Sequence, residues 1–365
     1  MRIVYGVHGY GLGHATRSMA VLPSLCRRHD VLILAGGDAY QAIGQEFPVS
    51  PVPALGYRYR SAGQRSTFLT LRAGLPVLFD VLDRGPTYTM VENLVHEFSP
   101  DLIITDAEVW TAWVGKRLQI PRISFDHYGL MAYFSPTMGF VDRMLNARDA
   151  RIYRLVANNP ERILVSSFYD APANRSGVKI IPPLLRKEVL DIKSTQEDHL
   201  LVYLNNGKHL YTDKLHQTLT RLQLPVVVYG TPKVGREGNV EFRPRGNQSF
   251  LKALASCRAL ICTAGNQLVG EAIYYRKPLL VMPEDCVEQR CNALAVERMN
   301  IGRQTILDRL SAEVIHAFLA EESTYRENME PYARDGSKEA LDAIEEFASE
   351  LVDFDVSRTE GRSVA

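Results

Sequence analysis

The chain has 365 residues, of which 46% are hydrophobic and 23% are charged, and these proportions exclude disordered and collagen-like proteins. Lysine plus arginine and aspartate plus glutamate number 42 each, which argues against nucleic-acid binding through bulk positive charge. At about 150 residues per domain, this length predicts two domains.

Short β-branched runs alternate with longer amphipathic segments along the first half of the chain, which is typical of βαβ units around a parallel sheet. Strands are predicted at residues 2–6, 31–35, 102–105, 122–125 and 163–165, and helices at 14–28, 68–82, 87–98, 107–118 and 139–156. The opening residues become glycine-rich too early for a signal peptide, and no apolar run reaches the ~20 residues of a membrane span. We therefore expect a cytoplasmic protein.

The alternating pattern stops at residues 169–190, where proline and small polar residues mark a connection, and then resumes. Strands are predicted at 200–204, 226–229, 240–242, 259–262 and 279–282, with helices at 213–222, 248–256, 266–275 and 288–299. The pattern predicts an α/β protein with two Rossmann-like domains facing across a cleft. The predicted parts are 1–168, a connection at 169–195, a second domain with a helical tail at 196–350, and a flexible end at 351–365.

The five cysteines include no CxxC pair. An odd number of cysteines without an export signal indicates reduced thiols, and no zinc site is predicted.

A glycine-rich turn, Gly9-Tyr10-Gly11-Leu12-Gly13-His14, follows the first predicted strand and opens the first helix. Gly11 and Gly13 lack the Cβ atoms that would hinder a close approach of the backbone to a ligand. The GxGxxG pattern of dinucleotide binding is not met, because His14 stands where the third glycine belongs. The imidazole of His14 could instead accept the proton of an attacking hydroxyl.

Asp106 follows the strand at 102–105, so it is expected at the same sheet edge as His14. A carboxylate there would fix the tautomer of the imidazole and stabilise its protonated form. A helix-capping role explains Asp106 equally well. For His14, which follows alternating glycines, a functional role is favoured over capping.

A second strand–turn–helix motif contains Thr263, Gly265 and Asn266. Gly265 would let backbone amides face a phosphate at the start of the helix. Glu271, about one and a half turns further on, could accept two hydrogen bonds from a ribose diol. A solvated surface carboxylate is the less favoured interpretation of Glu271.

Further polar residues follow two other predicted strands. Glu288, Gln289 and Asn292 suit the hydroxyls of a sugar, and Glu288 and Asn292 share one face of a helix, although helix capping is an alternative. The tight turn containing Asn206 and Gly207 could meet a diphosphate.

The segments GLGHATRS and CTAGNQLVGEAIYYRKPLLVMPEDCVEQRCNA resemble the GT-B glycosyltransferases. The resemblance is closest to glycosyltransferase family twenty-eight, the group of the lipid-II N-acetylglucosaminyltransferase and the diacylglycerol glycosyltransferases. It implies that His14 lies near the acceptor, that Glu271 binds the ribose of uridine, and that Glu288 and Gln289 meet the donor sugar. It also implies a nucleotide-sugar donor, UDP-linked, an inverting transfer and no required metal. Two features depart from the lipid-II enzyme: the glycines before His14 alternate, and a Gly-Ser-Gln-Gly turn is reduced to Asn-Asn-Gly.

The segment between Phe47 and Phe79 has no acidic residue and interleaves arginines with aromatic and leucine residues. The arginines are Arg58, Arg60, Arg65 and Arg72. This composition suits the surface of an anionic membrane, which would bring a lipid-linked hydroxyl to the first domain. An amphipathic helix docked on its own domain is the alternative.

Asp126 and His127 follow the strand at 122–125 and lie at the same expected edge. His127 could bind the acceptor or act as a rival base, and a hydrogen-bonded structural histidine is equally consistent with its position.

The sequence therefore predicts an inverting hexosyltransferase without a cofactor, in the cytoplasm or at the inner face of the membrane. His14 would deprotonate the acceptor hydroxyl, and helix N-termini near Asn206 and Gly265 would stabilise the departing diphosphate. Two other classes remain open. A nucleotide-sugar 2-epimerase shares this architecture but needs carboxylates that move a proton at carbon two. A non-catalytic subunit that presents nucleotide or lipid would have no need of His14.

Overall fold

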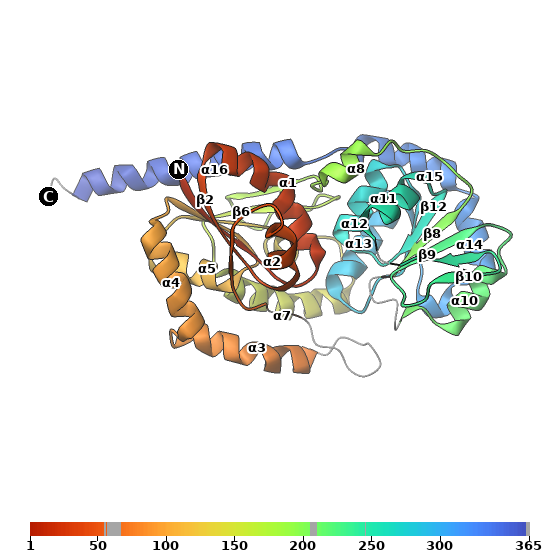
Figure 1. Cartoon of the computed structure of the whole chain (residues 1–365), viewed down its shortest axis with the longest axis horizontal. Helices are drawn as coiled ribbons and strands as arrows, with labels where there is room; N and C mark the ends of the chain where they lie inside the picture. Colours follow the sequence, from red (N-terminus) through yellow and green to blue (C-terminus); the bar gives the residue numbers. More distant parts are fainter. Residues whose placement is uncertain (55, 57–66, 205–209, 245, 363–365) are drawn as a thin grey trace.

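The computed structural model describes residues 1–54, 56, 67–204, 210–244 and 246–362. Within these ranges the chain forms two seven-stranded sheets in two α/β domains that lie side by side (Figure 1). The strand orders are β3-β2-β1-β4-β5-β6-β7 and β10-β11-β9-β8-β12-β13-β14. The predicted pair of Rossmann-like domains is confirmed.

The first sheet is parallel throughout, and helices cover both of its faces. Its strands are β1 (Arg2–Val7), β2 (Asp30–Ala35), β3 (Val49–Pro51), β4 (Leu102–Asp106), β5 (Arg122–Asp126), β6 (Arg162–Ser166) and β7 (Val178–Ile181). Its helices are α1 (Leu12–Arg28), α2 (Gly37–Ile43), α3 (Thr67–Leu82), α4 (Pro86–Phe98), α5 (Val109–Arg117), α6 (Gly129–Tyr133) and α7 (Phe140–Ala157). The central strands are almost entirely apolar because both of their faces are buried.

The second sheet is parallel except for the pair of β10 and β11 at one edge. Its strands are β8 (Leu200–Tyr203), β9 (Val226–Tyr229), β10 (Gly235–Glu237), β11 (Val240–Phe242), β12 (Ala259–Cys262), β13 (Leu279–Val281) and β14 (Gly302–Gln304). Its helices are α10 (Asp213–Thr220), α11 (Asn247–Ser256), α12 (Asn266–Tyr274), α13 (Val287–Arg298), α14 (Ala312–Leu319) and α15 (Glu322–Met329), with 3-10 turns at Leu307–Arg309 and Glu330–Tyr332.

The predicted domain boundaries need three corrections. The connection at 169–195 contains β7, which extends the first sheet to Ile181, and the short helix α8 (Lys187–Asp191). The tail forms α16 (Ser337–Arg362), which crosses back and lies along the first domain (Figure 1). Its apolar side chains, including Ile344 and Phe347, are buried in the core of that domain. The end predicted to be flexible continues this helix to Arg362.

No helix in the described ranges is long and apolar enough to cross a bilayer. Among the same residues, no group of three or more His, Cys, Asp or Glu side chains is arranged to hold a metal ion.

Candidate active site

The turn after β1 brings the first motif to the carboxyl edge of the first sheet. β1 pairs with β4 in parallel, so the ends of both strands meet at this edge. The backbone N–H of His8 donates to the carbonyl of Asp106 at 2.9 Å and fixes the two ends together. Gly11 has φ +78°, a conformation that favours glycine, and α1 begins at the next residue.

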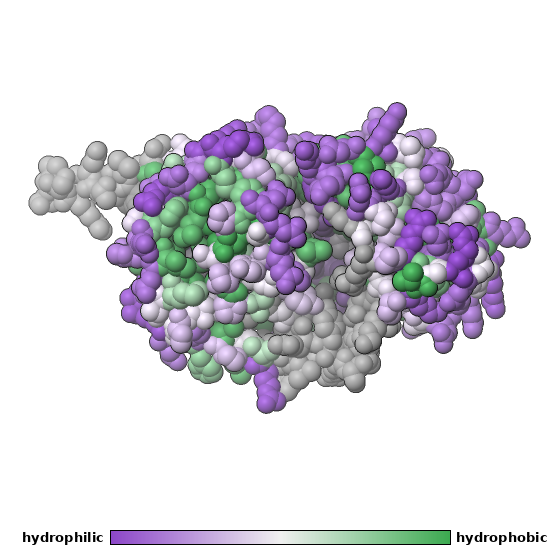
Figure 2. All heavy atoms as spheres, in the orientation of Figure 1, coloured by the Kyte–Doolittle hydropathy of each residue, from purple (hydrophilic) through white to green (hydrophobic). Residues whose placement is uncertain are grey.

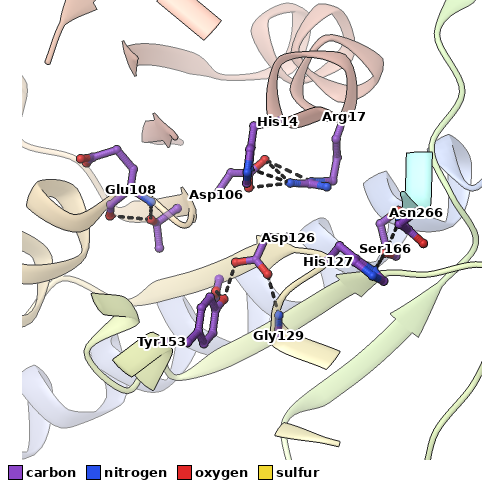
Figure 3. A network of polar contacts seen from close by, with 12 residues as sticks. His14, Arg17, Asp106, Glu108, Asp126, His127, Gly129, Tyr153, Ser166 and Asn266 are labelled. Atoms are coloured by element: carbon purple, nitrogen blue, oxygen red, sulfur yellow. Dashed lines mark hydrogen bonds and ion pairs between the residues drawn. The ribbon is translucent and has the colours of Figure 1, made fainter. Parts of the chain in front are cut away.

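His14 and Asp106, which the sequence places at one sheet edge, are in direct contact. The Nδ1 atom of His14 lies 2.6 Å from Oδ1 of Asp106 (Figure 3). The Asp106 side chain is completely buried, whereas a quarter of the His14 side chain is exposed. Because the carboxylate accepts at Nδ1, the imidazole carries its proton there and leaves the Nε2 lone pair free. The tautomer is therefore the one a general base needs.

Arg17 completes this cluster from the next turn of α1. Its Nη2 atom donates to Oδ1 and Oδ2 of Asp106 at 2.6 and 2.7 Å, and Nε donates to Oδ2 at 3.1 Å. Nη2 also lies 3.0 Å from Nδ1 of His14. Burial alone would raise the pKa of the Asp106 carboxyl, but the charges and hydrogen bonds of Arg17 and His14 hold it below its usual value. Asp106 is therefore ionised in spite of its burial.

His8 lies beside this cluster. The rings of His8 and His14 meet edge to face, with their centroids 4.9 Å apart. Burial, followed by the neighbouring His14, lowers the pKa of His8 to about 3. His8 is therefore neutral near neutral pH and adds no positive charge beside His14.

The side chains of Asp126 and His127 are both held by hydrogen bonds within the protein. Asp126 is buried, accepts from the backbone N–H of Gly129 at 2.7 Å and also accepts from the Tyr153 hydroxyl (Figure 3). Burial, with the nearby Asp106 charge, raises the pKa of the Asp126 carboxyl. Asp126 ends β5 at the sheet edge expected from the sequence, with its carboxylate bound to Gly129 and Tyr153.

His127 links the two domains. Its Nδ1 atom donates to the carbonyl of Ser166 at 2.9 Å, and its Nε2 atom lies 3.6 Å from the Glu288 carboxylate of the second domain. The same carbonyl accepts from the side-chain amide of Asn266 at 3.2 Å. Burial lowers the pKa of His127. These contacts bring the carboxyl ends of β5 and β6 against the starts of α12 and α13.

The second motif is arranged at the carboxyl end of β12. Apart from the residues next to it, no described residue has an atom within 4 Å of a Cβ added to Gly265, so no described side chain explains this glycine. Thr263 is buried in the same turn, and Asn266 keeps a buried amide oxygen without a hydrogen-bond partner among the described residues.

Gln289 and Asn292 are tied to the backbone of their own domain. The side-chain oxygen of Gln289 accepts from the N–H of Glu284 at 2.9 Å, and the side-chain amide of Asn292 donates to the carbonyl of Ala264 at 2.9 Å. Both side chains are buried. Of the sugar-binding trio predicted from the sequence, Glu288 alone remains partly exposed, at 23%.

Glu271 differs most from its predicted role. Its side chain is only 1% exposed, and its two oxygens accept from Nε and Nη2 of Arg186 at 3.0 and 3.1 Å. Gln267 donates to it as well, at 3.3 Å. The carboxylate that the sequence assigns to a ribose diol is therefore buried and paired with Arg186, and it is not the solvated surface carboxylate of the alternative interpretation. Asn206 and Gly207 lie outside the described residues.

A cavity of about 550 Å³ also lies between the domains. It is lined by the connection, α12 and α13, and its walls include Tyr169, Ile273 and Arg298. None of the predicted site residues in the described part of the chain lines it.

The comparisons with known proteins agree with this geometry. The model of the family described as Glycosyl transferase family 1 matches residues 1–322. The chain belongs to glycosyl transferase family 1. It is therefore a glycosyltransferase of the GT-B type, which acts with a nucleotide-sugar donor. The family expected from the sequence, number twenty-eight, is not the one whose model matches.

Solved structures of other GT-B glycosyltransferases share the fold. The glycotransferase of kitacinnamycin has a TM-score of 0.71 at 16% identity, over 95% of this chain and 99% of its own. UGT89C1 of Arabidopsis thaliana, complexed with UDP-L-rhamnose, has a TM-score of 0.69 at 14% identity, over 96% and 99%. MurG of Acinetobacter baumannii has a TM-score of 0.62 at 14% identity, over 94% and 99%. No curated protein matches the chain.

Sequence reasoning missed three residues of this site: His8, Arg17 and Arg186. Arg17 stands three residues after His14, and this spacing indicates that both side chains lie on one face of the helix. His8 directly follows the first strand and could be placed at its carboxyl end. Nothing in the sequence indicates that Arg186 meets Glu271.

Proposed function

We propose that this glycosyltransferase moves a hexose from a UDP-linked donor to a hydroxyl acceptor in a single step with inversion. The observation that carries the proposal is the contact between Nδ1 of His14 and the buried, ionised Asp106. The acceptor hydroxyl gives its proton to Nε2 of His14, and its oxygen forms the new bond to the anomeric carbon. The bond from that carbon to the diphosphate breaks at the same time, and the nucleoside diphosphate leaves.

The donor half of the site is formed by the second domain. Gly265 gives the diphosphate room to approach the N-terminus of α12, whose free N–H groups stabilise negative charge. Glu288 and the unpartnered oxygen of Asn266 are suited to accept from donor hydroxyls. Thr263, Gln289 and Asn292 support this edge from within, because their side chains are buried. Asn206 and Gly207 are assigned to the diphosphate on the sequence alone.

The acceptor is lipid-linked in this proposal, and the first domain meets an anionic membrane surface at the inner face of the cytoplasmic membrane. On the face drawn in Figure 2, hydrophobic residues gather on the first domain, while the second domain is mostly hydrophilic. Large apolar side chains are exposed on α3 and α7: Leu75, Phe79, Leu82, Phe140, Val141 and Met144. Arg143 and Arg148 are exposed on α7, among its exposed apolar side chains. Arg58, Arg60 and Arg65 lie outside the described residues.

Membrane contact is tested by sedimenting the protein with vesicles. We expect the chain to sediment with phosphatidylglycerol vesicles and to remain in solution with phosphatidylcholine vesicles. A variant with Phe140→Glu and Met144→Glu should lose this binding. Binding that is unchanged in this variant would remove α7 from the membrane-contacting surface.

The donor assignment is tested by a thermal-shift screen with UDP-, GDP- and dTDP-sugars and nicotinamide dinucleotides. A donor at ~1,000 times its dissociation constant stabilises the folded state by about 4 kcal/mol, so a true donor raises the melting temperature clearly. We expect UDP-sugars to give the largest rise. A rise with nicotinamide dinucleotides alone would contradict the proposal.

Incubation with the UDP-sugar alone distinguishes transfer from 2-epimerisation, because an epimerase would convert the donor without an acceptor.

A further inference from the structure

Arg17 is the permanently charged partner of the catalytic carboxylate. Its side chain is 6% exposed and that of Asp106 is 0% exposed. Three hydrogen bonds of 2.6 to 3.1 Å join the guanidinium to both carboxylate oxygens. These hydrogen bonds fix the orientation of the Arg17 and Asp106 side chains relative to each other. His14 donates to the same Oδ1 atom that Arg17 contacts.

Without a positive partner, a carboxyl group at this position would take up a proton. Burial disfavours the charged form of a carboxylate. A protonated Asp106 would donate its O–H to Nδ1 of His14, and the imidazole would then carry its own proton on Nε2. Alternatively, the carboxylate would hold a doubly protonated imidazolium. In both cases Nε2 bears a proton and cannot accept one from a hydroxyl.

We propose that Arg17 is a positioning residue of the transfer reaction, which keeps Nε2 of His14 free of a proton by holding Asp106 ionised. This inference rests on the proposed role of His14 as the base. It assigns to Arg17 no contact with substrate, and its action passes entirely through Asp106.

The other titratable neighbour of His14 does not replace Arg17. His8 approaches His14 ring to ring at 4.9 Å, and its low pKa leaves it neutral. Among the described residues that form ion pairs with Asp106, which are His14 and Arg17, only Arg17 is charged at every working pH. Removal of Arg17 therefore takes away the permanent positive charge among the described ion-pair partners of Asp106.

The test is ¹⁵N NMR of the histidine rings at pH 7.5, with His14 assigned from the spectrum of His14→Gln. In the parent protein we expect Nδ1 to bear the proton and Nε2 to be unprotonated. In Arg17→Met we expect Nε2 to be protonated in most molecules. In Arg17→Lys, which retains a positive charge, we expect Nε2 to remain unprotonated. Arg28→Met is the matched control, because Arg28 lies on the same helix with 57% of its side chain exposed.

An unprotonated Nε2 in folded Arg17→Met would overturn the inference, as would a protonated Nε2 in Arg17→Lys. If Arg17→Met does not fold, Arg17→Gln replaces it with the same expected result, because its amide donates to Asp106 without carrying a charge. A second readout is kcat, which should fall at least 100-fold in Arg17→Met, with KM for the donor within twofold of the parent value. The NMR measurement does not depend on activity. If the protein transfers no sugar, the proposed function is rejected, and the NMR spectra still show whether Arg17 sets the protonation of His14.

Discussion

Arg186 and Glu271 form a two-point ion pair that joins the connection between the domains to α12. The guanidinium donates from Nε and Nη2 to separate carboxylate oxygens at 3.0 and 3.1 Å. Next to this pair, a Cβ on Gly270 would lie 2.6 Å from Pro183, so α12 also packs closely against the connection. The helix assigned to the donor nucleotide is thus held by the segment that links the two domains.

Loss of Arg186 alone should be more damaging than loss of the whole pair. Arg186→Met leaves a 1% exposed carboxylate without its cation, and we expect the free energy of unfolding in urea to fall by about 3 kcal/mol. The double variant Arg186→Met with Glu271→Met removes both charges and should recover most of that loss. A double variant as unstable as the single one would contradict this account of the pair.

The glycines at the starts of α1 and α12 should prove to be functional and not structural. Within the part of the chain that the structure describes, no atom beyond the adjacent backbone lies within 4 Å of a Cβ added to Gly13 or Gly265, and neither glycine has a positive φ. We expect Gly13→Ala and Gly265→Ala to change the unfolding free energy by no more than about 1 kcal/mol. Gly13→Ala should nevertheless lower kcat, and Gly265→Ala should weaken donor binding at least tenfold.

Two other glycines serve as controls for that experiment. Gly74, in α3, also has no described neighbour within 4 Å of its added Cβ, so Gly74→Ala should be stable and fully active. At Gly302 an added Cβ would lie 2.0 Å from the carbonyl of Leu279, and Gly302→Ala should be strongly destabilised. Normal donor binding by Gly265→Ala would show that the diphosphate does not approach this turn.

His8 should make the folded state sensitive to acid. Its pKa is lowered to about 3 in the folded chain, whereas an unfolded histidine titrates near 6.5. Its contribution to stability is therefore fully present above pH 6.5 and is lost as the pH falls toward 3, because only the unfolded state takes up the proton. The loss is at most ~1.4 kcal/mol per pH unit.

Urea unfolding between pH 6.5 and 4.5 measures this contribution, and His8→Asn should flatten the slope. Asp106 does not interfere in this window. Its pKa is depressed, so its own contribution is present above about pH 4 and is lost only at lower pH. An equal slope in the parent and in His8→Asn would mean that His8 is freely protonated in the folded chain.

The sequence was sufficient for most of the fold and for placing His14 and Asp106 at one sheet edge. Strands β9, β11 and β12 have the predicted bounds, and in β9 and β12 this follows from apolar runs that are buried on both faces. His14 and Asp106 were placed together because neighbouring parallel strands end at one sheet edge. Strands β10 and β14 were not predicted, because their sequences, Gly-Arg-Glu and Gly-Arg-Gln, contain no apolar side chain.

Other features depend on tertiary contacts that a sequence pattern does not contain. Ile344, Phe347 and Leu351 form an apolar stripe on α16, but the pattern does not indicate which domain they pack against. Arg186 lies in a connection without periodicity, so its meeting with Glu271, 85 residues further along the chain, could not be predicted. The structure adds to the ribose contact predicted for Glu271 an ion pair with Arg186 that the sequence did not indicate.

The most direct test of the proposed mechanism is the initial rate of sugar transfer by His14→Ala compared with the parent, at saturating donor and acceptor. We expect kcat to fall by about 100- to 10,000-fold, the usual contribution of a general base, with donor affinity unchanged. A kcat equal to that of the parent would contradict the assignment of His14 as the group that takes the acceptor's proton.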